Sequence, residues 1–308
     1  MGRDESVSFF YVYLQINLCE VVMKKKILFI INPKSGTGRY KRVPNAVAAY
    51  LDQEKFQSAT ELASEAVRNG YYMVVVSGGD GTINEVVKAL VDSSTILGLL
   101  PTGSGNGLAH HMHLPFNLKK AVLLLNDEHE ELIDTVSMND LLFVSIAGVG
   151  YDAYVAEKYT NVKRRGLIPY LRLAVNNYFP YKPRVYHIEG ENNLKINALL
   201  VSFANSSQWG FNVKISPEAS VQDGWINMTA IQKPPVYALP RLLLYMLSGN
   251  LNRMTKYVKI YKMQDFDLYA EDGGELCTHL DGDYLSRQQR IHLRIHPKSL
   301  HIALKRTY

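Results

Sequence analysis

The stretch VVVSGGDGTINEVVKAL, Val74 to Leu90, joins a strand to a helix through a glycine-rich turn. Three consecutive valines are typical of a strand buried on both faces, as in a parallel sheet. Ile83, Val86, Val87 and Leu90 then recur at helical spacing. Such a turn leaves backbone N–H groups and a helix N-terminus available to a phosphate. An ordinary strand-to-helix connection explains the turn equally well, so the rest of the chain has to decide.

The composition is that of a globular protein of two domains. The chain has 308 residues, of which 47% are hydrophobic and 20% charged. Its net charge of +5 is too diffuse to indicate nucleic-acid binding but is compatible with an anionic membrane surface. The only cysteines are Cys19 and Cys277, which favours a reducing compartment and a cytoplasmic location.

Residues 1–22 read as an extension, either a poorly ordered tail or the product of an upstream start codon. Asp4 and Glu5 do not suit a signal peptide, and Gln15 and Glu20 interrupt the apolar run before it could span a membrane. We expect the fold to begin at Met23.

The first domain is expected to cover residues 23–130 and to alternate strands with helices, which indicates an α/β layered architecture. Its predicted strands are Ile27–Ile31, Met73–Val76 and Ile96–Leu100. Its predicted helices are Val43–Phe56, Ala59–Asn69, the one ending at Leu90, and Leu118–Leu125.

The second domain is expected to cover residues 131–297. Runs such as LLFVSIAG, INALLVSFAN, WINMTAI and IHLRIH are rich in β-branched and aromatic residues and are divided by turns, which indicates a mostly antiparallel β domain. Two helices are predicted within it, near Arg165–Tyr178 and in VYALPRLLLYMLSGN, where Pro240 opens or kinks the helix.

Each of the three strands of the first domain ends in a loop of small residues: NPKSG, GGDGT or TGSGN. Ligands of open α/β sheets bind beyond the carboxyl ends of the strands, so the three loops together indicate a polyphosphate site. A carboxylate beside phosphates requires a cation, and Asp80 therefore suggests Mg²⁺, bound directly or through water. The sequence lacks GxxxxGK[ST] and GxGxxG, which argues against a P-loop or Rossmann site.

With these loops in their order and spacing, the chain resembles the catalytic domain of the diacylglycerol kinase and sphingosine kinase family. AGVGYDAYVAEKYTNVKRRGLIPYL, SPEASVQDGWINMTAI and THLDGDYL extend the resemblance over about residues 26–304. It implies a three-layer α/β ATP-binding domain with a mostly parallel sheet, an antiparallel β-sandwich that takes the lipid, and an active site in the cleft between them. A last strand near Leu300–Leu304, within about residues 298–308, would return to the first domain.

The resemblance assigns nucleotide contacts to the three loops. The residues concerned are Asn32, Pro33, Lys34, Ser35 and Gly36 in the first loop, Gly78, Gly79, Asp80, Gly81, Thr82, Ile83 and Asn84 in the second, and Gly103 and Ser104 in the third. Asp80 resembles the family's Mg²⁺-linked aspartate.

The motif LDGD resembles the family's DGE, whose acid deprotonates or orients the lipid hydroxyl for attack on the γ-phosphate of ATP. Asp281 is expected to act as the base; Asp283 replaces the usual glutamate. Phosphoryl transfer needs in-line positioning, a metal and a base within reach of the hydroxyl, so this assignment is chemically consistent. An acidic hairpin turn is the alternative interpretation of the same residues.

Two further carboxylates have counterparts in the family. Asp223 resembles the centre of a structural Mg²⁺ site completed by the carbonyls of Ser220 and Trp225, although an Asp-Gly turn needs no metal. Asp152 resembles an aspartate near the polar head of sphingoid substrates, where it would pair with an ammonium group. The alternative is a helix cap. Together with Gly107 in GSGNGLA, Asp152 favours sphingoid bases over diacylglycerol.

The family's second strand has no counterpart in LDQEKFQSATELASEAV, where about ten residues are absent. We expect this to weaken nucleotide binding or to leave a gap at the edge of the sheet. His110, His111 and His113 lack Cys or Asp partners at ligand spacing, which argues against a metal site there. Basic and apolar residues alternate between Lys158 and Arg172, a pattern open to both membrane contact and a solvated face.

The sequence thus predicts an ATP- and Mg²⁺-dependent kinase of a membrane lipid, with diacylglycerol or a sphingoid base as acceptor. It would be cytoplasmic and peripheral to the inner face of the membrane, and a homodimer is left open. Two alternatives remain: an NAD kinase, which shares GGDGT, and a nucleotide-binding regulator that has lost catalysis.

Overall fold

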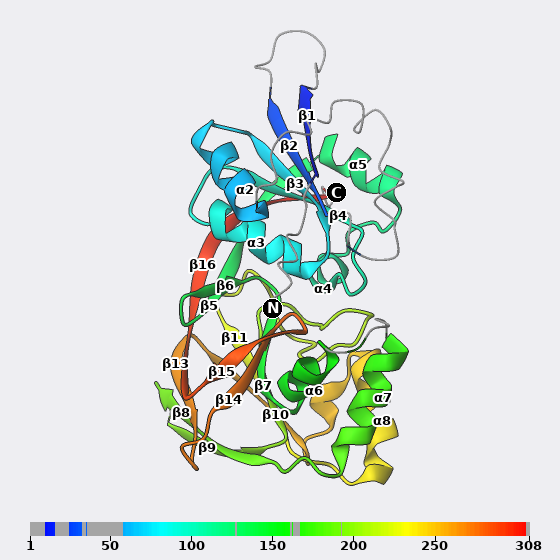
Figure 1. Ribbon diagram of the computed structural model, residues 1–308, viewed down its shortest axis with the longest axis vertical. Coiled ribbons are helices and arrows are strands. Elements are labelled where there is room, and N and C mark those ends of the chain that lie inside the picture. The colour runs from blue at the N-terminus through cyan, green and yellow to red at the C-terminus, as the bar shows by residue number, and fades with distance from the viewer. Residues whose placement is uncertain are drawn as a thin grey trace, which may run out of the picture. The chain divides into compact units, whose positions relative to one another are not determined.

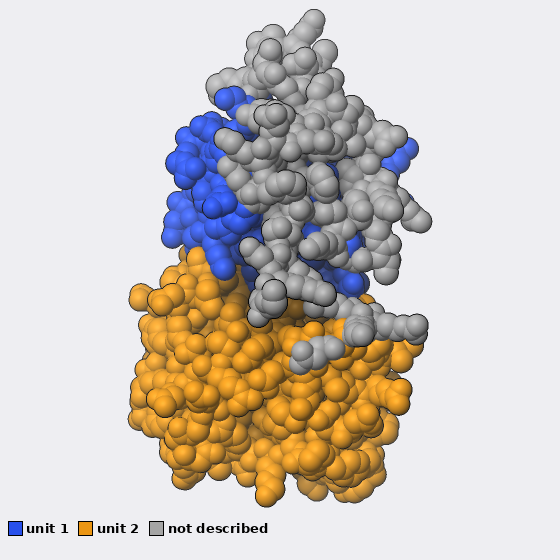
Figure 2. Space-filling model, viewed as in Figure 1, with its two compact units in different colours: residues 1–133, 298–308 blue, residues 134–297 orange. Residues whose placement is uncertain are grey.

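The computed structural model describes residues 10–15, 25–32, 35, 58–126, 128–160, 162, 167–191 and 193–305. The chain divides into two compact units (Figure 2). Unit 1 comprises Met1–Ile133 and Lys298–Tyr308, and unit 2 comprises Asp134–Pro297. Two strands, β5 (Glu128–Met138) and β16 (Arg290–Lys305), have residues in both units.

Unit 1 contains a mostly parallel sheet with the strand order β1-β2-β3-β4-β16 (Figure 1). Its first four strands are β1 (Phe10–Gln15), β2 (Lys26–Ile31), β3 (Met73–Gly78) and β4 (Ile96–Pro101). Every residue of β3 and β4 is buried, as expected of strands covered on both faces. The end of β16 pairs in parallel with β4 through Ile302 and Leu97, so the predicted return of the last strand is confirmed.

Helices cover both faces of this sheet because apolar side chains alternate between them. Ile27, Phe29 and Ile31 pack in one cluster with Ala121 and Leu125 of α5 (Leu118–Asn126). On the opposite side lie α2 (Ala59–Arg68) and α3 (Asp80–Leu90) (Figure 1).

The edge of the sheet beside β2 differs from expectation. Phe10–Gln15 form β1 and pair antiparallel with Lys26–Ile31. The expected tail therefore contributes a strand, and β1 lies where we expected the missing second strand to leave a gap. The predicted helix Val43–Phe56 lies outside the described residues.

Unit 2 is built from two antiparallel sheets, which confirms the predicted sandwich. One contains β16, β13 (Asp265–Ala270), β8 (Arg184–Gly190) and β9 (Leu194–Ala198), with β5 paired to β16 and β6 (Leu141–Phe143) paired to β5. The other runs in the order β12 (Val258–Met263), β11 (Ile226–Ile231), β10 (Leu200–Ala204), β7 (Ile146–Gly150), β14 (Leu276–Leu280) and β15 (Asp283–Gln288).

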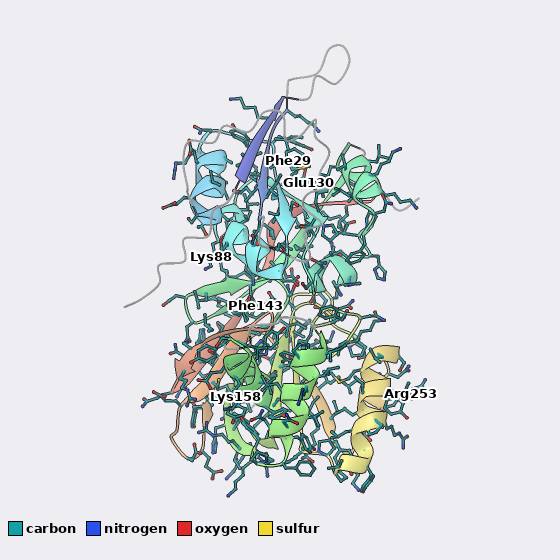
Figure 3. All side chains as sticks on the ribbon, turned by 45° about the vertical axis from the view of Figure 1, so that its right-hand side comes forward. Phe29, Lys88, Glu130, Phe143, Lys158 and Arg253 are labelled. Carbon is teal, nitrogen blue, oxygen red and sulfur yellow. The ribbon has the colours of Figure 1, made fainter. Side chains whose placement is uncertain are left out.

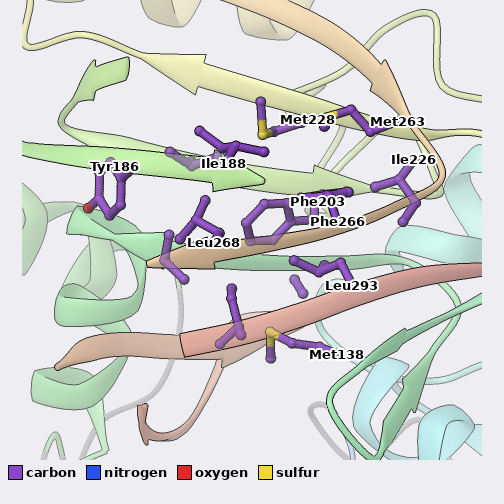
Figure 4. Packing of buried hydrophobic residues seen from close by; sticks show 14 of the residues in the cluster. Met138, Tyr186, Ile188, Phe203, Ile226, Met228, Met263, Phe266, Leu268 and Leu293 are labelled. Atoms are coloured by element: carbon purple, nitrogen blue, oxygen red, sulfur yellow. The ribbon is translucent and has the colours of Figure 1, made fainter. Parts of the chain in front are cut away.

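The core of the sandwich is a single cluster of apolar side chains from both sheets (Figure 4). Phe203 of β10 and Phe266 of β13 meet with ring centroids 5.9 Å apart, and Tyr186, Met228 and Leu293 extend the cluster. Because alternate residues of each strand face inward, these strands bury one face here.

Helices cover the outer face of the second sheet. They are α6 (Tyr151–Tyr159), α7 (Leu167–Tyr178) and α8 (Leu239–Ser248), the last preceded by the 3₁₀ turn η2 (Val236–Ala238) and followed by η3 (Leu251–Arg253). Pro240 lies in the first turn of α8, as predicted. Helix α6 was indicated only by the alternative interpretation of Asp152 as a helix cap. Among the described helices, none is both long and apolar enough to cross a bilayer.

Candidate active site

In unit 1 the three loops of small residues follow three neighbouring parallel strands. Asn32 comes directly after β2, Gly79 after β3, and Thr102 after β4. Because the carboxyl ends of parallel strands meet at one edge, the loops lie together there, as predicted from the sequence.

Hydrogen bonds join the first loop to the second. The Asn32 backbone N–H donates to the Ser77 carbonyl at 2.9 Å, and Asn32 Nδ2 donates to Thr82 Oγ1 at 2.8 Å. The side chain of Asn32 is therefore held against the first turn of α3. Pro33, Lys34 and Gly36 lie outside the described residues.

The second and third loops touch through their glycine backbones. A Cβ atom added to Gly103 would lie 2.4 Å from Gly79 Cα, so neither loop could keep its place with a side chain there. The Gly103 N–H donates to the Gly78 carbonyl at 3.0 Å. The glycines of GGDG and TGSG therefore permit a direct backbone approach between neighbouring loops.

Asn106 fixes the third loop. Its backbone adopts the left-handed conformation (φ 49°, ψ 50°), and Nδ2 donates to the Gly103 carbonyl at 2.8 Å. Within the described residues, Asn106 Oδ1 is buried without a hydrogen-bond partner. Ser104 of the same loop is exposed, whereas Ile83 and Asn84 at the start of α3 are buried.

Asp80, the first residue of α3, connects the second loop to α4 (Gly107–His111). Its two carboxylate oxygens accept the N–H groups of Gly107 at 2.9 Å and Leu108 at 3.2 Å. Burial raises the pKa of Asp80, and these two hydrogen bonds, with the nearby His110, oppose the rise. A carboxylate offers about four lone-pair sites, so Asp80 retains acceptor capacity for a metal or its waters.

The three histidines of this region have no metal-site geometry. Among the described residues, no cluster of three or more His, Cys, Asp or Glu could hold a metal ion. The His110 ring lies 4.2 Å from the Phe116 ring. Burial, with His113 nearby, lowers the pKa of His111 to about 4.

In unit 2 the motif LDGD forms the two-residue turn of the hairpin β14–β15. Asp281 (φ 48°) and Gly282 (φ 85°) both have positive φ, as a type I′ turn requires. Asp281 Oδ1 accepts the Ile146 N–H at 2.8 Å, and the Asp281 N–H donates to the Ile146 carbonyl at 2.8 Å. The hairpin interpretation is therefore correct, and it also fixes the carboxylate. Asp283 is exposed at the start of β15.

Asp152 in the first turn of α6 is buried against this hairpin. Its Oδ2 lies 3.0 Å from His279 Nε2, and its Oδ1 accepts the Ala153 N–H at 2.8 Å. The Gly282 N–H donates to His279 Nδ1 at 3.3 Å, which assigns the ring proton to Nε2. The chain Gly282–His279–Asp152 thus ties the turn that carries Asp281 to α6.

The contacts of Asp223 account for its position without a metal ion. Its Oδ2 forms an ion pair with Lys262 Nζ at 2.8 Å, and its Oδ1 accepts the Trp225 N–H at 3.2 Å. Ser220 Oγ accepts the Gln222 N–H at 3.3 Å. The metal role of Ser220, Asp223 and Trp225 stays a prediction, and these contacts agree with the Asp-Gly turn.

Two family models match the chain, one after the other. The diacylglycerol kinase catalytic domain matches residues 26–138, and the YegS C-terminal NAD kinase beta sandwich-like domain matches residues 145–304, more than half of the chain. This chain belongs to the diacylglycerol kinase family of enzymes.

Proteins named diacylglycerol kinase are similar over nearly their whole length. That of Staphylococcus epidermidis is 26% identical over 301 residues, covering 88% of this chain and 92% of its own. That of Staphylococcus saprophyticus is 24% identical over 286 residues, covering 85% and 90%. A crystal structure of a diacylglycerol kinase from Bacillus anthracis str. Sterne aligns with a TM-score of 0.65 at 18% identity, covering 90% and 95%, and shares the fold.

In this member of the diacylglycerol kinase family, three residues within the quoted motifs have structural roles that the sequence did not assign. His279 precedes LDGD and orients its turn, and Asn106 fixes the third loop. Thr102 lies buried beside Ser77, with their hydroxyl oxygens 3.2 Å apart. A histidine next to an acidic turn and an asparagine in a glycine loop were visible signals. The partners of Asn106 and His279 include residues only three positions away, Gly103 and Gly282, whereas Asp152 lies 127 residues from His279.

Proposed function

We propose that this chain is a lipid kinase that transfers the γ-phosphate of ATP to the hydroxyl of a membrane lipid and depends on Mg²⁺. One observation carries the proposal: three glycine-containing loops meet at one sheet edge, and Gly79 and Gly103 touch without intervening side chains. Such a surface exposes backbone to a polyphosphate, which a side chain would otherwise cover.

The residues of unit 1 fit a nucleotide with its metal. Asn32 and Thr82 hold the first two loops together, and Asp80 keeps lone pairs free after accepting two backbone N–H groups. Asn106 Oδ1 is a buried acceptor suited to a bound water or hydroxyl group. Bound Mg²⁺ would neutralise charge on the phosphates. Asp80 is the residue we assign to holding it, through water.

Asp281 is the residue we assign as the base. Its position is defined by two hydrogen bonds to Ile146. A carboxylate fixed in this way needs little reorganisation energy when it accepts the hydroxyl proton. Asp283, which is exposed beyond the turn, is the second carboxylate.

Diacylglycerol is the acceptor that we favour. The sequence argument for sphingoid bases depended on Gly107 and on Asp152 as the partner of an ammonium group, but the Asp152 carboxylate is buried and bonded to His279. Curated relatives carry the name diacylglycerol kinase. Diacylglycerol is neutral, so its phosphorylation requires a base for the hydroxyl but no carboxylate to pair with a charged head group.

The location we propose is cytoplasmic, at the inner face of the membrane where such a lipid resides. The chain has no described helix that could span the bilayer, so access to the lipid would be peripheral.

The test is a panel of acceptors with radiolabelled ATP, using the full chain. We expect label in phosphatidic acid from diacylglycerol, less from sphingosine, and none from NAD⁺. Label in NADP⁺ alone would replace the proposal with an NAD kinase. ATP binding by calorimetry without turnover of any acceptor would replace it with a catalytically inactive regulator.

A further inference from the structure

Most exposed apolar side chains of the described residues gather on two neighbouring helices of unit 2. Thirteen large hydrophobic residues are exposed, and nine of them lie on α7 with the residue after it, or between η2 and the end of α8. They are Ile168, Leu171, Val175, Phe179, Val236, Tyr237, Leu243, Leu244 and Leu247. We call these nine residues the two-helix face.

Both helices present their apolar residues on the side away from the sheet. On α7, Ile168, Leu171, Val175 and Phe179 follow the spacing of one helical stripe and are 80%, 42%, 63% and 69% exposed. The residues between them face inward: Tyr170, Leu173, Ala174 and Tyr178 pack on the cluster above the second sheet.

Helix α8 is apolar on nearly all sides, which normally marks a buried helix. Leu239, Leu242, Tyr245 and Met246 pack on the same cluster as α7. Leu243, Leu244 and Leu247 remain exposed on the other side, and Tyr237 before the helix is 81% exposed. A second apolar partner would account for this composition.

The two stripes lie on neighbouring helices that cover the same cluster. Helices α7 and α8 lie side by side in both views (Figures 1 and 3). Lys233 Nζ, just before η2, donates to the carbonyls of Phe179 at 3.1 Å and Tyr181 at 2.7 Å. The end of α7 is therefore held next to the start of the segment that leads into α8.

The segments that carry this surface are rich in basic residues, of which Arg184 pairs with Asp272 and Lys262 with Asp223. Residues 167–188 and 224–264 contain nine Lys and Arg and no Asp or Glu, whereas the rest of the chain has 25 of the former and 29 of the latter. Arg172, Arg241 and Arg253 are exposed on or directly after the two helices, and Figure 3 labels Arg253 beside α8. Long basic side chains beside apolar anchors suit a surface that is apolar inside and anionic outside.

We propose that the two-helix face docks this protein on an anionic phospholipid membrane, with the nine apolar side chains inserted between head groups and the arginines on lipid phosphates. The inference rests on the proposed function in one respect: the membrane would supply the lipid that accepts the phosphate. A second copy of the chain fits the surface less well, because a two-fold contact would bring the exposed Arg172, Arg241 and Arg253 of one copy close to those of the other.

The test measures membrane binding directly, by cosedimentation of the full chain with vesicles. Vesicles of equal parts phosphatidylglycerol and phosphatidylcholine should bind the protein, vesicles of phosphatidylcholine alone should bind it at least about tenfold less, and salt should weaken the binding. Leu244→Ser on α8 is compared with Leu123→Ser on α5, since both leucines are more than half exposed. We expect the double variant Leu244→Ser with Phe179→Ser to bind anionic vesicles about tenfold more weakly than wild type. Leu123→Ser should bind them as wild type does.

The charges are tested in the same way. Arg172→Glu with Arg253→Glu should reduce binding to anionic vesicles by at least about tenfold, whereas Lys119→Glu with Lys120→Glu on α5, an equal change in net charge at exposed positions, should reduce it far less. Unchanged binding in both the leucine–phenylalanine and the arginine variants would overturn the proposal. The proposal would also be overturned if the wild-type chain did not bind vesicles. The same holds if the wild-type chain were a dimer and the face variants were monomers.

Activity separates this proposal from the proposed function. The face variants should phosphorylate a water-soluble, short-chain diacylglycerol at the wild-type rate but a vesicle-embedded diacylglycerol poorly. If wild type binds vesicles and phosphorylates neither lipid, the kinase assignment fails and the docking surface stands. If the variants fail equally on both lipids while they bind vesicles normally, the docking surface fails.

Discussion

The buried carboxylate of Asp152 and the imidazole of His279 lie 3.0 Å apart, although 127 residues separate them in the chain. The same imidazole accepts the N–H of Gly282 in the turn that carries Asp281. Because the ring has one partner on α6 and one in the hairpin, its removal should affect both the stability of unit 2 and the placement of the proposed base.

His279→Ala should therefore lower the melting temperature and kcat, while the KM for ATP changes little. Removal of the hydrogen-bond partner of a buried polar group costs about 1–3 kcal/mol of unfolding free energy. His279→Gln retains an N–H donor and should recover part of both quantities. His129→Ala, on a half-exposed histidine, serves as the control. A stability loss with kcat unaltered would show that the pair is structural only.

Asp281→Asn should abolish transfer to every lipid without loss of fold. Asparagine keeps an oxygen for the Ile146 N–H and adopts positive φ readily, so the turn should persist. The amide cannot accept the hydroxyl proton. Asp283→Asn is the matched change two residues later. If Asp281→Asn remains active while Asp283→Asn does not, the roles of the two carboxylates are exchanged.

Asp80→Asn should reduce turnover by orders of magnitude, because it removes the charge that we assign to holding the metal. The amide also keeps only one of the two acceptors for Gly107 and Leu108, so a stability loss of about 1 kcal/mol should accompany it. Asp92→Asn, at an exposed position with φ 57°, is the control. Turnover near the wild-type rate would exclude Asp80 from the metal site.

Gly103→Ala should disrupt nucleotide binding more than Gly79→Ala does. The new Cβ at position 103 would meet Gly79 Cα at 2.4 Å, whereas one at position 79 would meet Gly103 Cα at 3.4 Å. Only the first overlap forces the two loops apart. Calorimetric titration with ATP, together with melting curves, measures both effects; equal affinities in the two variants would contradict the close approach.

His111 should make unit 1 less stable in acid. Its pKa is about 4 in the folded protein, below the ordinary 6.5, because burial and His113 disfavour the charged form. Between these values the unfolded chain binds the proton more strongly, so stability falls as the pH drops from 6.5 toward 4. His111→Gln should show a smaller drop in melting temperature across this window, and His129→Gln an unchanged one. Equal drops for His111→Gln and wild type would contradict the assignment.

The elements next to the three loops of small residues could be predicted because their sequence signals are local. The valines of β3 and the helical spacing from Ile83 to Leu90 lie within one short stretch. The turn at Asp281 follows from an Asp-Gly pair between two apolar runs. Fold class and loop positions therefore follow from the sequence.

The partners of the carboxylates could not be predicted. Asp80 accepts bonds from α4, and Asp223 pairs with Lys262. Each partner lies 27 or more residues away, and no spacing rule links such pairs. The extent of helix α6 was not predicted, because its tyrosines and valine also suit a strand. Strand β1 was missed because polar residues surround its apolar run.

The course of β16 has a consequence for folding during synthesis. Unit 2 ends at Pro297, and its sheets are complete once that residue has been made. The strand that pairs with β4 in unit 1 comes only afterwards, at Ile302. Domains usually fold from the N-terminus as the chain emerges. Here the sequence of the second unit is complete while the first still lacks a strand, so a released chain that ends at Pro297 should contain a protease-resistant unit 2 and a cleavable unit 1.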